Sequence, residues 1–186
     1  MPKRVDHEQR RREITEAVWD IAVAEGLPAV TLRRVAAQAG VSMNLVQYYF
    51  RTKDEMVRYG LQRVIEVAVA RMREALTSAG RDPVAVVRAC LTGMLPLDDT
   101  SRRTTAIYHA YLSYSATNPE IAALTRDIPR DLAARLEAVL PGARRELDSL
   151  IAMTAGLATW ILVGSCTAEE AVALVDFRLA ALTEAT

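Results

Sequence analysis

Aromatic residues, lysine, cysteine, proline and glycine are all scarce in this sequence. Phe, Trp and Tyr make up 5% of the 186 residues while hydrophobic residues make up 51%, so the core must be mainly aliphatic. The chain is long enough for one domain or two small ones. Seven prolines, eight glycines and almost no alternating runs favour long helices over a sheet with many turns.

Cysteine and histidine are too few to build most reactive sites. Cys90 and Cys166 lie far apart in apolar surroundings, which favours two buried free thiols over a disulfide. The positions of Asp98, Asp99 and His109 fit helix-terminal and structural roles better than catalysis. No nucleophile motif, glycine-rich phosphate loop or metal-ligand spacing is present in the sequence. We therefore expect no enzymatic activity, no cofactor and no bound metal.

Charge is balanced overall but unevenly distributed. Residues 1–63 carry 11 Arg and Lys against 8 Asp and Glu, whereas residues 64–186 carry 12 against 15. A basic N-terminal third on a slightly acidic body permits a nucleic-acid-binding head. The charged N-terminus is unlike a signal peptide, so we expect a cytoplasmic protein. Residues 149–168 are uncharged and as long as a membrane span, but their Ser, Thr and Gly content favours a buried helix with no membrane partner.

Apolar periodicity predicts an all-α fold of about nine helices. The predicted helices span residues 10–25, 32–39, 43–50, 53–78, 83–96, 98–117, 118–140, 143–165 and 168–184. Gly26 and Gly40 are stop signals, and Pro129 is expected to kink or break the seventh helix. Thr52 and Glu55 form a capping box at the start of the long helix, in which each side chain satisfies the other's backbone N–H group.

Residues 31–56, TLRRVAAQAGVSMNLVQYYFRTKDEM, join two short helices through a glycine turn, which is a helix-turn-helix pattern. The second short helix turns Val46, Tyr49 and Phe50 inward. Its outer face then carries Met43, Asn44, Gln47 and Tyr48. In a DNA major groove, Asn and Gln amides can bond to adenine and a Met can lie on a thymine methyl group. The residues expected to hold phosphates are Thr31, Arg33, Arg34, Ser42, Tyr48 and Lys53.

A less specific interpretation stays open on this pattern alone. A helix pair with a polar face also occurs in helical protein-interaction modules, which would bind a partner there and show no salt-dependent association with DNA. The basic runs at residues 2–4 and 10–12 fit an N-terminal arm on DNA, but a charge run is also typical of a solvated helix face.

Residues 8–58 resemble the DNA-binding domain of TetR-type bacterial transcriptional regulators. The matching features are the A-x-x-A-G-V-S turn, the aromatic Y-F ending and the T-K-D-E that follows. The resemblance implies sequence-specific binding of double-stranded DNA, with Met43, Asn44 and Gln47 facing bases. Many members have Gly, Thr and Tyr where this chain has Asn44, Leu45 and Gln47, so an operator sequence does not transfer.

The resemblance also implies a division of the chain. We expect a helix-turn-helix domain with a basic arm over residues 1–52 and a ligand-binding and dimerisation domain over residues 53–186, joined through helix 53–78. Small residues in segment 149–168 allow close helix approach, so this segment and helix 168–184 predict half of an intermolecular four-helix bundle, with an ordinary core helix as the alternative. A two-fold homodimer matches a near-palindromic operator. The predicted dimer interface comprises Leu147, Leu150, Ile151, Thr154, Leu157, Ile161, Val172, Val175, Leu179 and Leu182.

Polar-tipped side chains in apolar company are the candidates for an effector pocket. They are Met94, Tyr108, Tyr111, Ser115, Met153 and Trp160. Three of them share one face of helix 98–117, although a tyrosine stripe is also typical of a core or an interface. Together with the resemblance, these features predict a transcriptional repressor that a small, largely apolar effector releases from its operator.

Overall fold

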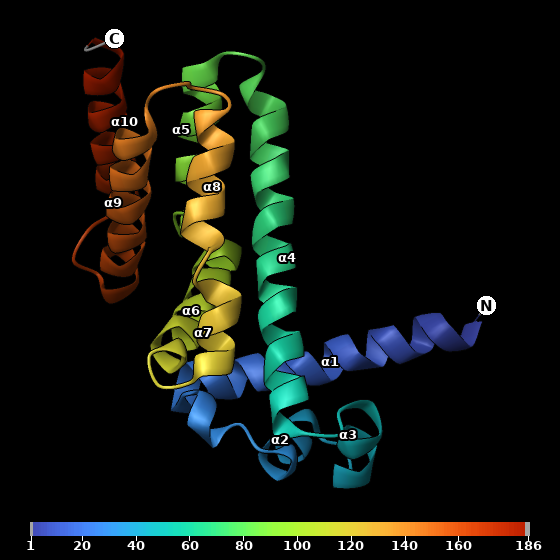
Figure 1. Cartoon of the computed structure of the whole chain (residues 1–186). Coiled ribbons are helices and arrows are strands. Elements are labelled where there is room, and N and C mark those ends of the chain that lie inside the picture. The colour runs from blue at the N-terminus through green and yellow to red at the C-terminus, as the bar shows by residue number, and fades with distance from the viewer. Residues whose placement is uncertain (1, 185–186) are drawn as a thin grey trace. The chain divides into compact units, whose positions relative to one another are not determined.

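A computed structural model describes the backbone of residues 2–184 and the side chains of residues 7–181. Every regular element in this part of the chain is a helix, which confirms the all-α prediction. The elements are α1 (Pro2–Glu25), η1 (Leu27–Ala29), α2 (Leu32–Ala39), α3 (Met43–Tyr49), α4 (Lys53–Ala79), α5 (Pro83–Gly93), α6 (Asp99–Ser115), α7 (Pro119–Thr125), α8 (Ile128–Glu137), α9 (Arg144–Val163) and α10 (Ala168–Glu184). Figure 1 shows them in chain order.

The predicted helix 118–140 is broken into two. α7 ends at Thr125 and α8 begins at Ile128, with Pro129 in the first turn of α8. Proline is tolerated there because the first N–H groups of a helix have no partner inside the helix. The break near this proline explains why the described residues contain one α-helix more than the nine expected.

Contacts divide the chain into two compact units. Unit 1 comprises residues 1–65 and 107–122, and unit 2 comprises residues 66–106 and 123–186. α4 is one continuous helix whose residues belong to both units (Figure 1). The predicted functional boundary at residue 52 is drawn differently from these units, because residues 107–122 pack with the N-terminal helices.

Unit 1 is built around the apolar face of α1. Ile14, Val18 and Ile21 are buried with residues of α2, α3 and the first half of α4. The Trp19 indole N–H donates to the carbonyl oxygen of Gly60 in α4, at 3.1 Å. A Cβ atom on Gly60 would collide with the hydroxyl of the buried Tyr111, so only glycine allows α6 to approach this closely.

Unit 2 is built around α9, which packs on α5, α8 and α10. Its core is largely the set that the sequence assigned to the dimer interface. Seven of the ten side chains are buried outright in this core, another is the fully buried Thr154, and Val172 packs against it half-buried. The side chain of Leu182 lies outside the described residues. The structure therefore corrects the predicted interface, because these side chains are enclosed by their own chain.

α9 is long and apolar enough to cross a membrane by length and composition, with a mean hydropathy of 1.4. A core helix of a soluble protein passes the same test. The apolar stripe of α9 from Leu147 to Ile161 is buried within unit 2, so its hydrophobicity is explained by packing.

Candidate nucleic-acid interface

The two short helices of the helix-turn-helix are fixed by caps at their ends. The Thr31 hydroxyl accepts from the backbone N–H of Arg34 at 3.1 Å and so begins α2. Gly40 ends α2 in the left-handed conformation, with φ 65°, which glycine adopts without steric cost. The Ser42 hydroxyl then accepts from the N–H of Leu45 at 3.2 Å and begins α3. Local sequence thus sets the turn between the helices.

The outer face of α3 lies where the sequence placed it. Met43 is 43% exposed, Tyr48 is 71% exposed, and Asn44 and Gln47 are exposed as well. On the opposite side, Val46 and Phe50 are fully buried and Tyr49 is half-buried against the same core. The predicted separation of inward and outward side chains is therefore confirmed. The outer face carries two amides, a thioether and a phenol, and no charge.

The residues expected to hold phosphates differ in how many of their hydrogen-bonding groups are already used within the chain. The hydroxyls of Thr31 and Ser42 use an acceptor position for capping and keep their proton to donate. Arg33 is exposed and takes part in none of the ion pairs found among the described side chains. The Lys53 ammonium donates to the Pro28 carbonyl oxygen at 2.9 Å, which leaves two of its N–H groups.

Arg34 is the exception among these residues. Its Nε and Nη2 donate to one carboxylate oxygen of Glu25, at 3.1 and 2.6 Å, and its Nη1 donates to Gln38 at 3.0 Å. This guanidinium is therefore engaged within the domain. These bonds tie α2 to the end of α1 and use three of the five guanidinium N–H groups, so a phosphate contact by Arg34 stays a prediction.

The capping box at the start of α4 forms with one change of partner. The Thr52 hydroxyl accepts from the N–H of Glu55 at 3.1 Å, as predicted. The Glu55 carboxylate, however, accepts from the N–H of Arg51 at 3.0 Å rather than from Thr52. It also receives the Arg11 guanidinium at 3.3 Å, so the cap links α4 to α1.

Contacts between α1 and α4 were not predicted from the sequence. The Arg11 guanidinium lies over the rings of Phe50 and Tyr59, 4.7 and 4.4 Å from their centroids. The Tyr59 hydroxyl donates to Glu8 at 2.5 Å. Burial first, and then this hydrogen bond, raises the pKa of Tyr59 to about 12. These pairs join residues more than 35 positions apart, and local sequence patterns do not identify such partners.

The predicted effector-pocket residues fall in different units. Tyr108, Tyr111 and Ser115 belong to unit 1, and the other three, Met94, Met153 and Trp160, belong to unit 2. Tyr111 is fully buried core, and the Ser115 hydroxyl donates to the Leu112 carbonyl oxygen at 2.6 Å. Trp160 is 55% exposed. Their grouping around one ligand stays a prediction.

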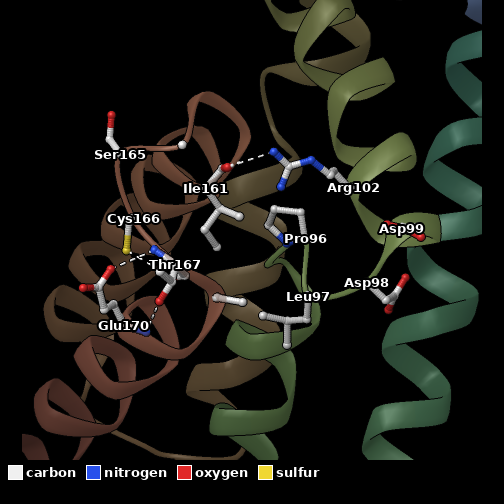
Figure 2. A pocket seen from close by; sticks show the side chains of 12 residues that line it. Pro96, Leu97, Asp98, Asp99, Arg102, Ile161, Ser165, Cys166, Thr167 and Glu170 are labelled. Carbon is white, nitrogen blue, oxygen red and sulfur yellow. Dashed lines mark hydrogen bonds between the residues drawn. The ribbon is translucent and has the colours of Figure 1, made fainter.

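An open cleft of about 420 Å³ lies within unit 2, beside the α5–α6 connection and the α9–α10 turn (Figure 2). Its lining residues are Pro96, Leu97, Asp98, Asp99, Arg102, Ile161, Gly164, Ser165, Cys166, Thr167, Ala168 and Glu170. This set contains none of the six predicted effector-pocket residues. The cleft was not predicted from the sequence, because its walls are two helix connections that lie far apart in the chain.

Several polar groups of this cleft are bonded to other parts of the chain. The Arg102 guanidinium donates to the carbonyl oxygen of Ile161 at 3.2 Å (Figure 2). It also donates to the carbonyl oxygen of Leu162 at 3.2 Å. Thr167 and Glu170 cap α10 reciprocally, at 2.8 and 3.1 Å. The backbone N–H of Ser101 donates to Asp98 and holds the pKa of that carboxyl below its usual value. Helix caps thus supply much of the polar lining of the cleft.

Family comparisons cover both the helix-turn-helix and the C-terminal helices. Residues 14–59 match the family described as bacterial regulatory proteins, tetR family, and residues 83–184 match the C-terminal region of BetI-type transcriptional repressors. The chain belongs to the tetR family. It is therefore a DNA-binding transcriptional regulator, and a helical interaction module that does not bind DNA is not favoured.

Individual tetR-family relatives agree with this assignment. The HTH-type transcriptional regulator PksA of Bacillus subtilis is 32% identical over 117 residues, which span 62% of this chain but only 56% of PksA. The HTH-type transcriptional regulator BetI of Paraburkholderia xenovorans is 30% identical over 166 residues, 84% of each chain. The crystal structure of a transcriptional regulator from Rhodococcus sp. Rha1 matches with a TM-score of 0.83 at 28% identity, over 94% of this chain and 96% of that one.

Proposed function

We propose that this regulator reads its operator with the outer face of α3. The base-contacting residues are Met43, Asn44 and Gln47, whose exposed side chains stand opposite the buried Val46 and Phe50. That separation is the observation that carries the proposal, because a helix must be held from behind to present its side chains to base edges. Amide side chains favour adenine, and the thioether favours a thymine methyl group.

Phosphate contacts surround this face in the proposal. Thr31, Ser42 and Tyr48 donate through hydroxyls, and Arg33 and Lys53 supply positive charge. Lys53 is already oriented by its hydrogen bond to Pro28, so it can meet a phosphate with little further ordering. Arg34 would contact a phosphate through the two guanidinium N–H groups that its bonds to Glu25 and Gln38 do not use.

Substitutions at Gln47 and Lys53 test this division of roles. Gln47→Ala should change base preference at one operator position, at a cost of about 1–3 kcal/mol for the preferred base. Lys53→Ala should weaken binding to all sequences alike and lower the slope of log K against log salt by about one. Selection from a random duplex pool with each protein measures both effects. Equal loss on every sequence for both variants would contradict the proposal.

We further propose that a second copy of the chain covers an apolar face of α9 and α10. The exposed residues of this face are Ala152, Ala155, Gly156, Trp160, Val163, Leu174 and Phe177. Val163 and Phe177 are each 69% exposed, which is unusual for large apolar side chains on packed helices. Gly156 has open space around it and permits close helix approach. Two such faces form a four-helix bundle, and a two-fold dimer suits a near-palindromic operator.

The introduction of a negative charge on this surface tests the homodimer. Trp160→Glu and Phe177→Glu should each shift the protein towards monomer in sedimentation equilibrium, because a carboxylate would be buried without a partner. Val23→Glu is the matched control, since Val23 is 50% exposed on α1, outside this face. A wild type that is monomeric at micromolar concentration, or variants that remain dimeric, would contradict the proposal.

We propose that the protein acts in the cytoplasm as a repressor and that a small, largely apolar effector binds its C-terminal helices and lowers operator affinity. The match of residues 83–184 to BetI-type repressors supports this regulation. A coupling of about 1–3 kcal/mol would change affinity roughly 5- to 150-fold. Native mass spectrometry of the freshly purified protein tests the idea: a co-purified small molecule whose removal tightens operator binding supports it, and unchanged binding after its removal opposes it.

A further inference from the structure

Three aromatic rings meet at the junction of α1 and α3. The imidazole of His7 lies 4.6 Å from the ring centroid of Tyr49 and 5.9 Å from that of Tyr48, with interplanar angles of 54° and 63°. Tyr48 and Tyr49 are themselves perpendicular, with centroids 5.0 Å apart. Such edge-to-face arrangements are the attractive geometry for aromatic pairs.

The three rings of this cluster differ in their exposure to solvent. Tyr49 is half-buried against the core of unit 1 and His7 is half-buried, whereas Tyr48 is 71% exposed. The exposed Tyr48 phenol therefore packs against two rings that are themselves half-buried. A side chain restricted in this way loses less conformational freedom when it binds than one that moves freely in solvent.

His7 is held in place by its neighbour in the chain. The Glu8 carboxylate accepts the Tyr59 hydroxyl proton at 2.5 Å, and it lies 3.7 Å from the Arg12 guanidinium. The Tyr59 contact attaches this turn of α1 to α4. Tyr59 also packs on Phe50, at the end of α3, with ring centroids 5.4 Å apart. The position of His7 beside Tyr48 is thus set by contacts to both α3 and α4.

We propose that His7 is a positioning residue for DNA binding: its ring holds the Tyr48 phenol in the orientation that meets a backbone phosphate. α1 then contributes to operator affinity without a base contact of its own. The inference rests on the proposed phosphate role of Tyr48.

A double-mutant cycle tests the proposal on the full-length protein. The probe is the duplex that the wild type selects from a random pool, and the four proteins are wild type, His7→Ala, Tyr48→Ala and the double variant. His7→Ala should weaken binding roughly 3- to 10-fold in the wild-type background, and less than about 2-fold when Tyr48 is already alanine. The salt slope should not change between wild type and His7→Ala, because no phosphate contact of His7 itself is removed.

Two further variants separate positioning from simple packing. His7→Phe keeps a ring against Tyr48 and should restore affinity to within about 2-fold of wild type. Gln9→Ala changes an exposed residue of α1 that bonds to Glu13 and to no other described side chain, and it should leave affinity unchanged. Thermal unfolding of each protein corrects for any loss of folded material.

The outcomes distinguish the inference from the function on which it rests. Equal loss from His7→Ala in both Tyr48 backgrounds, failure of His7→Phe to restore binding, or a reduced salt slope would overturn the positioning role. A Tyr48→Ala variant with wild-type affinity would instead overturn the phosphate role of Tyr48 proposed above. Loss at Tyr48 with no effect of His7 overturns the inference alone.

Discussion

At the scale of single residues, the contact of Gly60 in α4 with Tyr111 in α6 leaves no space for a larger side chain. The Tyr111 hydroxyl is buried, faces Gly60, and has no hydrogen-bond partner among the described residues. A buried hydroxyl without a partner costs about 1–3 kcal/mol. The tyrosine ring nonetheless fills the space over the glycine.

Gly60→Ala should therefore lower the free energy of unfolding by about 1–3 kcal/mol, because the new Cβ would collide with the Tyr111 hydroxyl. Tyr111→Phe removes the orphaned hydroxyl and should be neutral or stabilising. The double variant should recover most of the loss caused by alanine. Urea unfolding of the four proteins measures this coupling, and additive effects would contradict it.

Tyr59 makes stability depend on alkaline pH. Its pKa is raised from 10.0 to about 12 in the folded protein, so the folded state binds more protons than the unfolded state between these values. The stabilisation is complete below pH 10 and is lost as pH rises through about 12. Tyr59→Phe cannot ionise, so its free energy of unfolding should fall less over this interval. Urea titrations at both pH values measure the difference.

The matched control for this experiment is Tyr48→Phe, which removes an exposed phenol from the same unit. It should keep the wild-type loss of stability between pH 10 and 12. Burial also raises the pKa of Tyr108 and Tyr111, and both remain in every protein compared. An identical alkaline slope for wild type and Tyr59→Phe would contradict the raised pKa of Tyr59 in the folded protein.

At the scale of elements, the caps decide where helices start and stop. Thr52→Ala removes the acceptor for the N–H of Glu55 and should cost about 1 kcal/mol of stability. The control is Thr77→Ala, in the last turns of α4, where the hydroxyl bonds only to the Arg73 carbonyl oxygen and alanine suits a helix. Urea unfolding compares the two. An equal effect of both substitutions would mean that the cap contributes nothing specific.

Elements were also the level at which the sequence was most informative. Gly40, Ser42 and Thr52 lie at the helix ends that they predicted, and the predicted helix 118–140 is interrupted next to Pro129. These signals are local, because a cap or a proline acts on backbone groups a few positions away. The outward face of α3 was predictable for the same reason, since helix periodicity fixes which side chains oppose Val46.

Partners between distant elements were less predictable. α9 has two apolar sides, one of large residues such as Leu150 and one of small residues ending in Trp160. Periodicity shows both sides but not which neighbour covers each, and the stronger stripe was assigned to a second copy although the core of unit 2 uses it. The salt bridge of Arg34 with Glu25 escaped for a similar reason, because a free cation and a paired one look alike in sequence.

At the scale of the whole molecule, the two compact units share helices instead of a linker. α4 contributes residues 53–65 to unit 1 and 66–79 to unit 2. A helix transmits displacement along its length because its backbone hydrogen bonds resist bending. The helix-turn-helix and the C-terminal helices are therefore joined in sequence by a helix rather than by an irregular linker.

The placement of the two tryptophans gives each unit an intrinsic optical reporter. Trp19 in unit 1 is 8% exposed and donates its indole N–H, whereas Trp160 in unit 2 is 55% exposed on the face proposed for the second copy. Dilution of a Trp19→Phe variant should shift indole emission to longer wavelength as Trp160 enters water, while a Trp160→Phe variant should show a constant spectrum. Emission that does not change with concentration in the first variant would mean that Trp160 stays exposed to solvent at every concentration. Any self-association of this regulator would then have to use another surface.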